Sequence, residues 1–155
     1  MAEVRPILIV DDEEIVLVAL RDTLLREGYT AVSSPHAVHA LSVLKEQEFS
    51  VVITDQQMPM VSGLEFLAQV RQIQPDATRI LITAVLNIGT LIDAINKAEI
   101  YRFVVKPWSR EELLATVKSA VERYDLVSKN SRLLAQTLQE NAQLRQQAGK
   151  VPPNG

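Results

Sequence analysis

Five short apolar runs alternate with amphipathic segments along the first 125 residues, and this alternation restricts the fold more than any other feature. The runs occupy residues 7–10, 29–32, 51–54, 79–83 and 102–105, and helical patterns span 14–26, 35–47, 63–72 and 89–98. Strands that alternate with helices form parallel sheets with helices on both faces. We therefore predict an α/β fold, a doubly wound five-stranded parallel sheet. Ser109 and Glu112 have capping-box spacing and mark the start of a last, extended C-terminal helix.

Residue types at the ends of the helical patterns set the expected limits of the helices. Gly28 suits the end of the first helix. Ser33 and Ser34 suit the cap of the second helix, with Pro35 in its first turn. Ser62 is the expected cap of the third helix. The apolar positions of the first helix that we expect to face the core are Ile15, Val18, Ala19 and Leu25.

Composition excludes several classes of protein. The chain contains no cysteine, which excludes disulfides, thiolate metal sites and cysteine nucleophiles. Its formal net charge of −3 is too small to indicate nucleic-acid binding over the whole surface. The sequence has neither a signal-peptide pattern nor a run of about 18 apolar residues. We therefore expect a cytoplasmic, soluble protein that binds neither nucleic acid nor membrane directly.

Polar side chains follow four of the five apolar runs. Asp11 and Asp12 follow the first run and Asp55 follows the third. Thr83 ends the fourth run and Lys106 follows the fifth. Ligands of such sheets bind outside the carboxyl ends of the strands, which lie at one edge. We therefore expect these five side chains to converge.

The chemistry of this set favours phosphoryl transfer with Mg²⁺. Three carboxylates at one site repel one another, and a hard divalent cation relieves the repulsion. The absence of His and Cys from the set argues against zinc. An ammonium group and a hydroxyl group nearby suit a phosphoryl group, with one carboxylate as the nucleophile that forms an acyl phosphate. The competing interpretation is a structural Asp–Lys pair beside two solvent-facing aspartates.

The motifs resemble those of the receiver domains of two-component response regulators over roughly residues 5–125. The matching segments are IVDDE, TDQQMP with Gly63 eight residues after Asp55, ITA and FVVKPW, in this order. The resemblance implies a flavodoxin-like sheet with strand order 2-1-3-4-5. It also implies a phosphoprotein that receives its phosphoryl group from a sensor histidine kinase or a phosphotransfer protein. Such a domain catalyses only its own phosphorylation and dephosphorylation.

Carried over position by position, the resemblance makes Asp55 the phosphoacceptor. The implied metal ligands are Asp11, Asp12, Asp55 and the backbone carbonyl group of Gln57. Thr83 and Lys106 would contact the phosphoryl group, and Phe103 would be the aromatic residue that changes position together with Thr83. A cis peptide bond before Pro107 is usual in this family and would direct Lys106 inward.

Two other functions compete with this interpretation. Haloacid-dehalogenase-type phosphatases also use an aspartate nucleophile at a strand end, with a second Asp two residues later as acid and base. Gln57 occupies that position here and cannot transfer protons, so turnover of external phosphoesters is not expected. The alternative function is a phosphorylation-independent docking or dimerisation scaffold, which requires loss of acidic or Lys positions. None of these positions is lost.

Glycine and proline are absent between Ser109 and Ala148, which predicts a helix of roughly 60 Å. A heptad pattern gives an apolar stripe broken by polar residues, at Val117, Ala120, Tyr124, Val127, Ser131, Leu134, Leu138 and Asn141. An eleven-residue spacing also occurs, between Asn130 and Asn141 and between Leu133 and Leu144. A seven-residue period and an eleven-residue period therefore compete. We favour a parallel coiled-coil homodimer or a signalling linker over a solvated single helix, with Asn141 as the residue that sets the register.

The expected divisions of the chain are a receiver domain at 1–125, a helical extension or coiled-coil linker at 126–150 and a disordered end at 151–155. The IYRFVVKPW segment and the long helix resemble receivers joined to HD-type phosphodiesterases, to phosphatases or to transcriptional regulators of hydrogenase genes. These output classes stay open as alternatives.

Overall fold

Five parallel strands pair in the order β2-β1-β3-β4-β5, which confirms the predicted topology. The computed structural model describes residues 4–84 and 87–149. The strands are β1 (Ile7–Val10), β2 (Ala31–Ser34), β3 (Val51–Asp55), β4 (Thr78–Thr83) and β5 (Arg102–Val105). Strands β1, β3 and β4 are buried along their whole length because helices cover both faces of the sheet.

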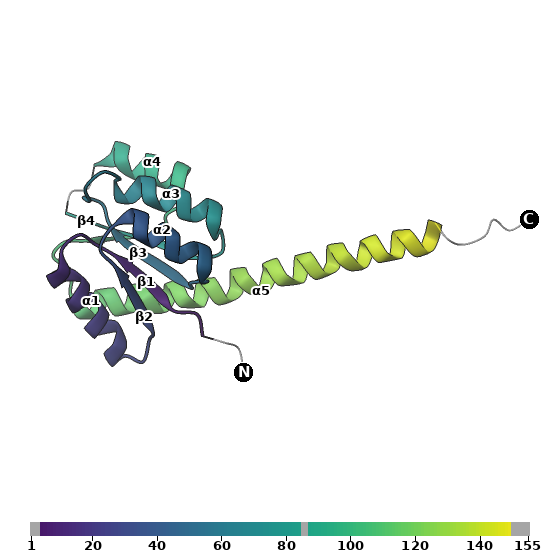
Figure 1. Cartoon of the computed structure of the whole chain (residues 1–155), viewed down its shortest axis with the longest axis horizontal. Helices are drawn as coiled ribbons and strands as arrows, with labels where there is room; N and C mark the ends of the chain where they lie inside the picture. The colour runs from purple at the N-terminus through teal and green to yellow at the C-terminus, as the bar shows by residue number, and fades with distance from the viewer. Residues whose placement is uncertain (1–3, 85–86, 150–155) are drawn as a thin grey trace, which may run out of the picture.

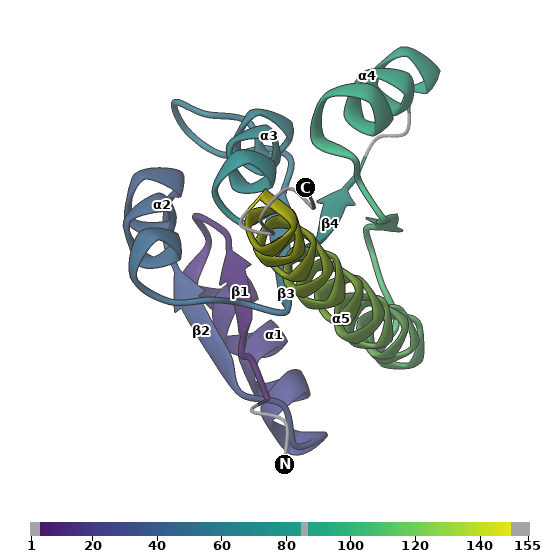
Figure 2. The same ribbon diagram turned by 90° about the vertical axis from the view of Figure 1, so that its right-hand side faces the viewer.

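The helices form two layers around the sheet (Figure 1). They are α1 (Glu14–Arg26), α2 (Ala37–Glu46), α3 (Gly63–Ile73), α4 (Ile88–Ala98) and α5 (Arg110–Gly149). Helices α2, α3 and α4 cover one face, and α1 and α5 cover the other (Figure 2). Two apolar clusters correspond to these layers: one includes Phe66 and Leu81, and the other includes Leu20 and Val117.

The second strand lies two residues later than predicted. β2 occupies Ala31–Ser34 because its pairing with β1 continues until Ser34 lies opposite Val10. Ser33 and Ser34 therefore belong to the strand, and the prediction that they cap α2 was wrong. His36 caps α2 instead: its Nδ1 atom accepts a hydrogen bond from the backbone N–H of His39 at 3.2 Å. Pro35 precedes the helix, outside its first turn.

The buried face of α1 also differs from the prediction. Leu17, Leu20 and Leu24 face the core. The predicted positions are exposed, namely Ile15 (84%), Val18 (54%), Ala19 and Leu25. Both sets have helical spacing, so the sequence offers two apolar faces. Packing against the sheet buries the leucine face and leaves the other in solvent.

Three helix ends carry the residues that the sequence predicted there, namely Ser62, Ser109 and Gly28. The Oγ atom of Ser62 accepts a hydrogen bond from the N–H of Glu65 at 3.1 Å at the start of α3. Ser109 accepts one from the N–H of Glu112, also at 3.1 Å, at the start of α5. Gly28 follows α1 with a φ of +89°, a conformation that favours glycine.

α5 is one continuous helix of 40 residues whose second half leaves the body (Figure 1). Ser128 is its last buried residue, and the hydroxyl group of Ser131 donates a hydrogen bond to Asp76 at 3.0 Å. All side chains from 132 to 148 are exposed. No break in the helix marks the predicted division at residue 125, and the end predicted at 151–155 lies outside the described residues. No helix among residues 4–84 and 87–149 is long and apolar enough to cross a membrane.

Candidate functional site

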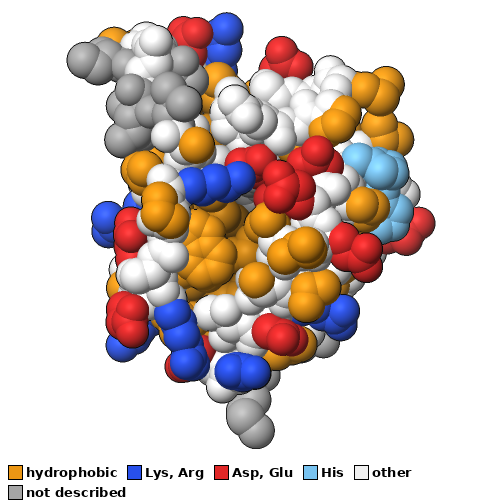
Figure 3. Space-filling model, turned by 90° about the vertical axis from the view of Figure 1, so that its left-hand side faces the viewer, with side chains coloured by type: hydrophobic (Ala, Val, Ile, Leu, Met, Phe, Trp, Pro, Cys, Tyr) orange, Lys and Arg blue, Asp and Glu red, His pale blue; other side chains and the backbone are white. Residues whose placement is uncertain are grey.

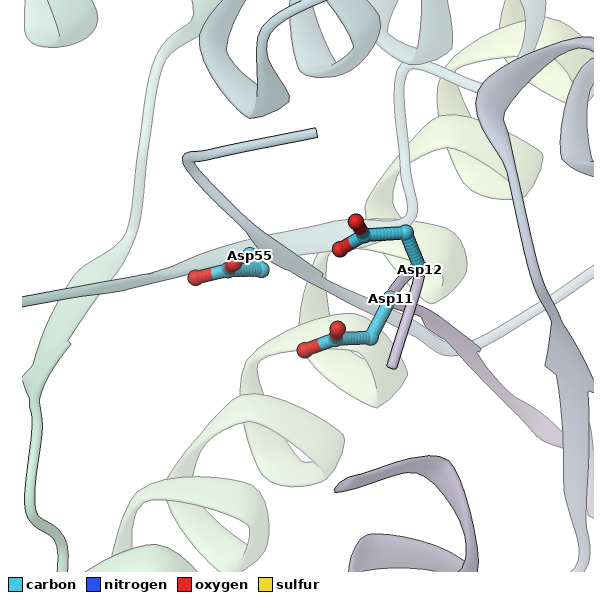
Figure 4. Close-up of side chains that lie close together, drawn as sticks. All are labelled: Asp11, Asp12 and Asp55. Atoms are coloured by element: carbon cyan, nitrogen blue, oxygen red, sulfur yellow. The ribbon is translucent and has the colours of Figure 1, made fainter. Parts of the chain in front are cut away.

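Parallel pairing of β1 with β3 brings two carboxylates together. Val10 pairs with Thr54, so Asp11, which follows β1, lies beside Asp55 at the end of β3. Asp11 is 1% exposed and Asp55 is 6% exposed, whereas Asp12 lies on the surface. One carboxylate oxygen from each of the three residues lies within 4.8 Å of the others (Figure 4). The structure thus places the three predicted carboxylates at one site.

The interactions of the Asp11 carboxyl group offset only part of the free-energy cost of its burial. Burial raises the pKa of Asp11 to about 6, and the charge of Asp55 acts in the same direction. A hydrogen bond from the backbone N–H of Glu13 to Oδ1, at 2.9 Å, acts against this rise. The Oδ2 atom is buried and has no hydrogen-bond partner among the described residues. A buried oxygen without a partner, beside two further carboxylates, fits the oxygen ligation that Mg²⁺ requires.

Lys106 forms an ion pair with Asp55, whose Oδ1 atom lies 2.9 Å from Nζ. The backbone N–H of Lys106 donates to the carbonyl oxygen of Thr83 at 3.0 Å, which continues the pairing of β4 with β5. The Lys106–Pro107 peptide bond is cis, as the resemblance implied. Burial alone would lower the pKa of Lys106, but the hydrogen bond to Asp55 and the charges of Asp55 and Asp11 raise it overall. Lys106 is therefore a cation held against the Asp55 carboxylate.

Thr83 and Phe103 lie on the same face of the sheet, on adjacent strands. Leu81 pairs with Phe103 and Thr83 pairs with Val105. Because side chains alternate along a strand, Leu81 and Thr83 share a face, and Phe103 shares it with them. Thr83 is buried, and the half-buried Phe103 packs against the cluster under α2, α3 and α4. Gln57 is exposed in the loop after β3, and the role of its carbonyl group stays a prediction.

Gly63 allows α3 to begin directly against the segment that carries Asp55. A Cβ atom at this position would overlap the backbone carbonyl oxygen of Asp55. The N–H of Gly63 donates to the carbonyl oxygen of Gln56, and the N–H of Leu64 donates to its side-chain Oε1, both at 2.9 Å. The family motif contains this glycine, but only the structure shows the close contact that requires it.

Figure 3 shows the end of the body that lies opposite the α5 extension of Figure 1. Acidic side chains gather there beside a basic one, with hydrophobic side chains around them. Asp55 supplies a buried anionic oxygen, and Lys106 supplies a cation that can neutralise phosphoryl oxygens. The carboxylate oxygens of the acidic cluster lie close enough together to suit ligation of a divalent cation.

Comparisons of the sequence with known proteins agree with this chemistry. The family described as "Response regulator receiver domain" matches residues 7–118. The hydrogenase transcriptional regulatory protein HoxA of Cupriavidus necator is 35% identical over 144 residues, covering 93% of this chain and 30% of that protein. The C4-dicarboxylate transport transcriptional regulatory protein DctD of Rhizobium meliloti is 29% identical over 133 residues, covering 86% and 29%. The chain thus spans less than a third of the length of these curated relatives.

Solved structures show the same architecture. The signal receiver domain of an HD domain-containing protein from Pseudomonas fluorescens Pf-5 has a TM-score of 0.75 and 35% identity, covering 79% of this chain and 98% of that one. The beryllofluoride-activated NtrC4 receiver domain dimer has a TM-score of 0.72 and 35% identity, covering 77% and 98%. With the strand order and the acidic cluster described above, these matches show that the chain belongs to the family of response regulator receiver domains.

Proposed function

We propose that this chain is a phosphorylation-activated receiver that accepts a phosphoryl group on Asp55 with Mg²⁺ from a sensor histidine kinase or a phosphotransfer protein. One observation carries the proposal: the buried Asp55 carboxylate lies 2.9 Å from Nζ of Lys106 and beside Asp11, whose buried Oδ2 has no partner among the described residues. Membership of the receiver family supports the same role.

In the proposed transfer, an Asp55 oxygen attacks the phosphorus atom of a phosphohistidine on the donor. The O–P bond forms as the N–P bond breaks, and the departing imidazole nitrogen keeps the electron pair and takes up a proton. Lys106 exchanges part of its ion pair with the carboxylate for contacts with phosphoryl oxygens, and Thr83 donates its hydroxyl hydrogen. A divalent cation held by Asp11, Asp12, Asp55 and the carbonyl group of Gln57 would neutralise the remaining charge.

The donor protein would meet an apolar surface beside this site. Ile15 and Val18 on α1 are exposed, and Val18 lines a groove that also includes Asp12 and Pro35. Exposed apolar side chains that gather beside polar ones are typical of protein-binding surfaces. A helix that presents a phosphohistidine could therefore bury apolar area while its phosphoryl group reaches Asp55.

The signal would leave the site through β5 and α5. A phosphoryl group adds negative charge and acceptor oxygens at Asp55, and Thr83 gains a hydrogen bond by moving toward them. Phe103 lies on the same sheet face, one strand away, and can rotate into the space that Thr83 leaves. Since α5 continues without a break into the extension, the change would reach a downstream output domain or a second copy paired through the C-terminal helix.

Phosphorylation by acetyl phosphate tests the proposal. Intact-mass spectrometry should show one added phosphoryl group on the native chain with Mg²⁺, and loss of this species with EDTA or in Asp55→Asn. Asp22→Asn, which removes an exposed carboxylate from α1, is the matched control and should react like the native chain. Full labelling of Asp55→Asn, or labelling unaffected by EDTA, would contradict the proposal.

A further inference from the structure

Arg79 on β4 is the largest fully buried side chain among the described residues, and the site described above does not use it. Its guanidinium group donates a hydrogen bond to the carbonyl oxygen of Ala98, the last residue of α4, at 2.7 Å. It also donates to the carbonyl oxygens of Ala77, at 2.9 Å, and Pro75, at 3.2 Å, in the turn before β4. The end of α4 is thus tied to β4 and to the turn that precedes it.

A second arginine holds the same helix end from α3, which lies beside α4 (Figure 2). Arg71 donates through Nη1 to the carbonyl oxygen of Lys97 at 3.3 Å and through Nη2 to Oε1 of Glu99 at 2.8 Å. Oε2 of Glu99 lies 3.7 Å from Nη2 of Arg79. The last carbonyl groups of a helix have no partner within the helix, so the two arginines act as its cap. We refer to Arg71, Arg79 and Glu99 as the arginine clasp.

The backbone of Glu99 supports the clasp as a built feature. Glu99 follows α4 with a φ of +46°, in the left-handed region where glycine is the usual residue after a helix. Any side chain at this position strains the backbone. The Glu99 carboxylate, however, lies between the guanidinium groups of Arg71 and Arg79, and glycine could not supply it.

The two ends of α4 are attached differently. Among its described side chains, the buried ones are Ala94 and Ala98, both in the C-terminal half. At the other end, the exposed Asn87 caps the helix by accepting a hydrogen bond from the N–H of Gly89, a contact within the same turn. Thr83 ends β4 five residues before α4 begins. The described contacts therefore hold the end of α4 that is far from Thr83.

Strand β4 carries both the clasp and Thr83. Arg79 is the second residue of the strand and Thr83 is the last, so roughly 13 Å separate them. The N–H of Tyr101 donates to the carbonyl oxygen of Arg79 at 2.9 Å, which holds the segment that leads into β5 at the same level. A movement of Thr83 toward a phosphoryl group thus begins at one end of a strand whose other end is held.

We propose that the arginine clasp is a fixed point of the switch: when Asp55 is phosphorylated, the start of α4 changes position and its C-terminal end keeps its place on the body. The inference rests on the movement of Thr83 included in the proposed function and adds the point at which that movement ends. Arg79 is a positioning residue that acts through the backbone of α4.

Distances between spin labels test the fixed point in the full chain, which has no native cysteine to react with the label. Gly89→Cys and Asn96→Cys place labels near the two ends of α4, on one helix face because seven residues complete about two turns. The reference labels are Lys45→Cys on α2 and Asp22→Cys on α1, and all four positions are exposed. On addition of beryllofluoride and Mg²⁺, the distances from position 89 should shift several-fold farther than those from position 96.

Arg79→Lys tests the clasp itself. Lysine keeps the positive charge but lacks the planar fork that reaches several carbonyl groups at once. In this variant the shift at position 96 should become comparable to the shift at position 89. Glu99→Gln, which alters an exposed side chain, should act in the same direction and serves if Arg79→Lys does not fold. Arg102→Gln, which changes an exposed arginine outside the clasp, is the matched control and should give the native result.

Equal shifts at positions 89 and 96 of the native chain would overturn the fixed point while leaving the switch in place. No shift at either position would overturn the inference together with the signal relay of the proposed function, whereas phosphorylation of Asp55 by acetyl phosphate would still test the transfer step separately. A native result in both Arg79→Lys and Glu99→Gln would overturn the role of the clasp.

Discussion

The Asp11 carboxyl group makes the metal-free protein sensitive to pH. Its pKa rises from 3.8 to about 6, chiefly through burial. Between these pH values the folded chain holds a proton that the unfolded chain has released. The contribution of Asp11 to the free energy of unfolding therefore decreases as pH rises through this window and stays low above it. A divalent cation would offset this loss because it binds the ionised carboxylate.

The variant Asp11→Asn separates the effect of Asp11 on the free energy of unfolding from the effects of the other titrating groups. In EDTA, the variant should resist urea better than the native chain at pH 7.5, and the advantage should shrink at pH 4.5. Mg²⁺ should stabilise the native chain at pH 7.5 more than it stabilises the variant. Asp22→Asn is the control because that side chain is exposed and lies outside the acidic cluster. An advantage of Asp11→Asn that is equal at both pH values would contradict the prediction.

Arg79 is a buried cation that holds the end of α4. Its side chain is 1% exposed and donates hydrogen bonds to the carbonyl oxygens of Ala98 (2.7 Å), Ala77 (2.9 Å) and Pro75 (3.2 Å). Burial lowers the pKa of Arg79, and the carboxylate of Glu99, 3.7 Å away, acts against this decrease. Removal of the guanidinium group would leave three carbonyl groups without this donor.

Arg79→Ala should therefore lower the free energy of unfolding by about 3 kcal/mol, measured by urea denaturation. Arg71→Ala is the matched control because Arg71 also pairs with Glu99, at 2.8 Å, but from an exposed position. Arg71→Ala should lower the free energy of unfolding by less than about 1 kcal/mol. Similar losses in the two variants would show that the buried carbonyl contacts contribute little.

The junction of β3 with α3 depends on a single glycine. Gly63→Ala should displace α3 or the Asp55 backbone because the added methyl group has no space beside the Asp55 carbonyl oxygen. We expect slower phosphorylation by acetyl phosphate and a lower melting temperature. Gly89→Ala is the matched control: its added atom would meet the movable Asn87 side chain at 3.3 Å. Normal phosphorylation and stability of Gly63→Ala would contradict the close packing that the structure shows.

The sequence predicted where the helices and strands lie better than it predicted which of their faces are buried and which residues they contact. Val51 to Asp55 could be read as a buried strand with a carboxylate at its end because β-branched runs and turn residues are local signals. The exposed face of α1 was mispredicted, since Ile15 and Val18 have the same helical spacing as the leucines that face the core. Burial of Arg79 and the contact of Gly63 with Asp55 depend on segments distant in sequence or on close backbone packing, which no local pattern contains.

The molecule as a whole joins a site at one end of the sheet to a helix that leaves at the other (Figure 1). Phosphorylation at Asp55 should therefore alter self-association or the protection of residues 126–148. Multi-angle light scattering and amide hydrogen exchange, with and without beryllofluoride and Mg²⁺, measure these two quantities. Lys106→Ala should fold normally by circular dichroism and show a reduced response. Identical mass and identical protection of the native chain in both states would remove the support for signal relay through α5.

Chemical trapping of the phosphorylated residue locates the acceptor. Borohydride reduces an acyl phosphate to an alcohol, so a phosphorylated aspartate becomes homoserine, which peptide mass spectrometry can identify by position. After treatment with acetyl phosphate and Mg²⁺, homoserine should appear at position 55 alone, and Lys106→Ala should yield much less of it. Homoserine at position 11 or 12, or its absence from position 55 in a fully phosphorylated sample, would contradict the assignment of Asp55 as the phosphoacceptor.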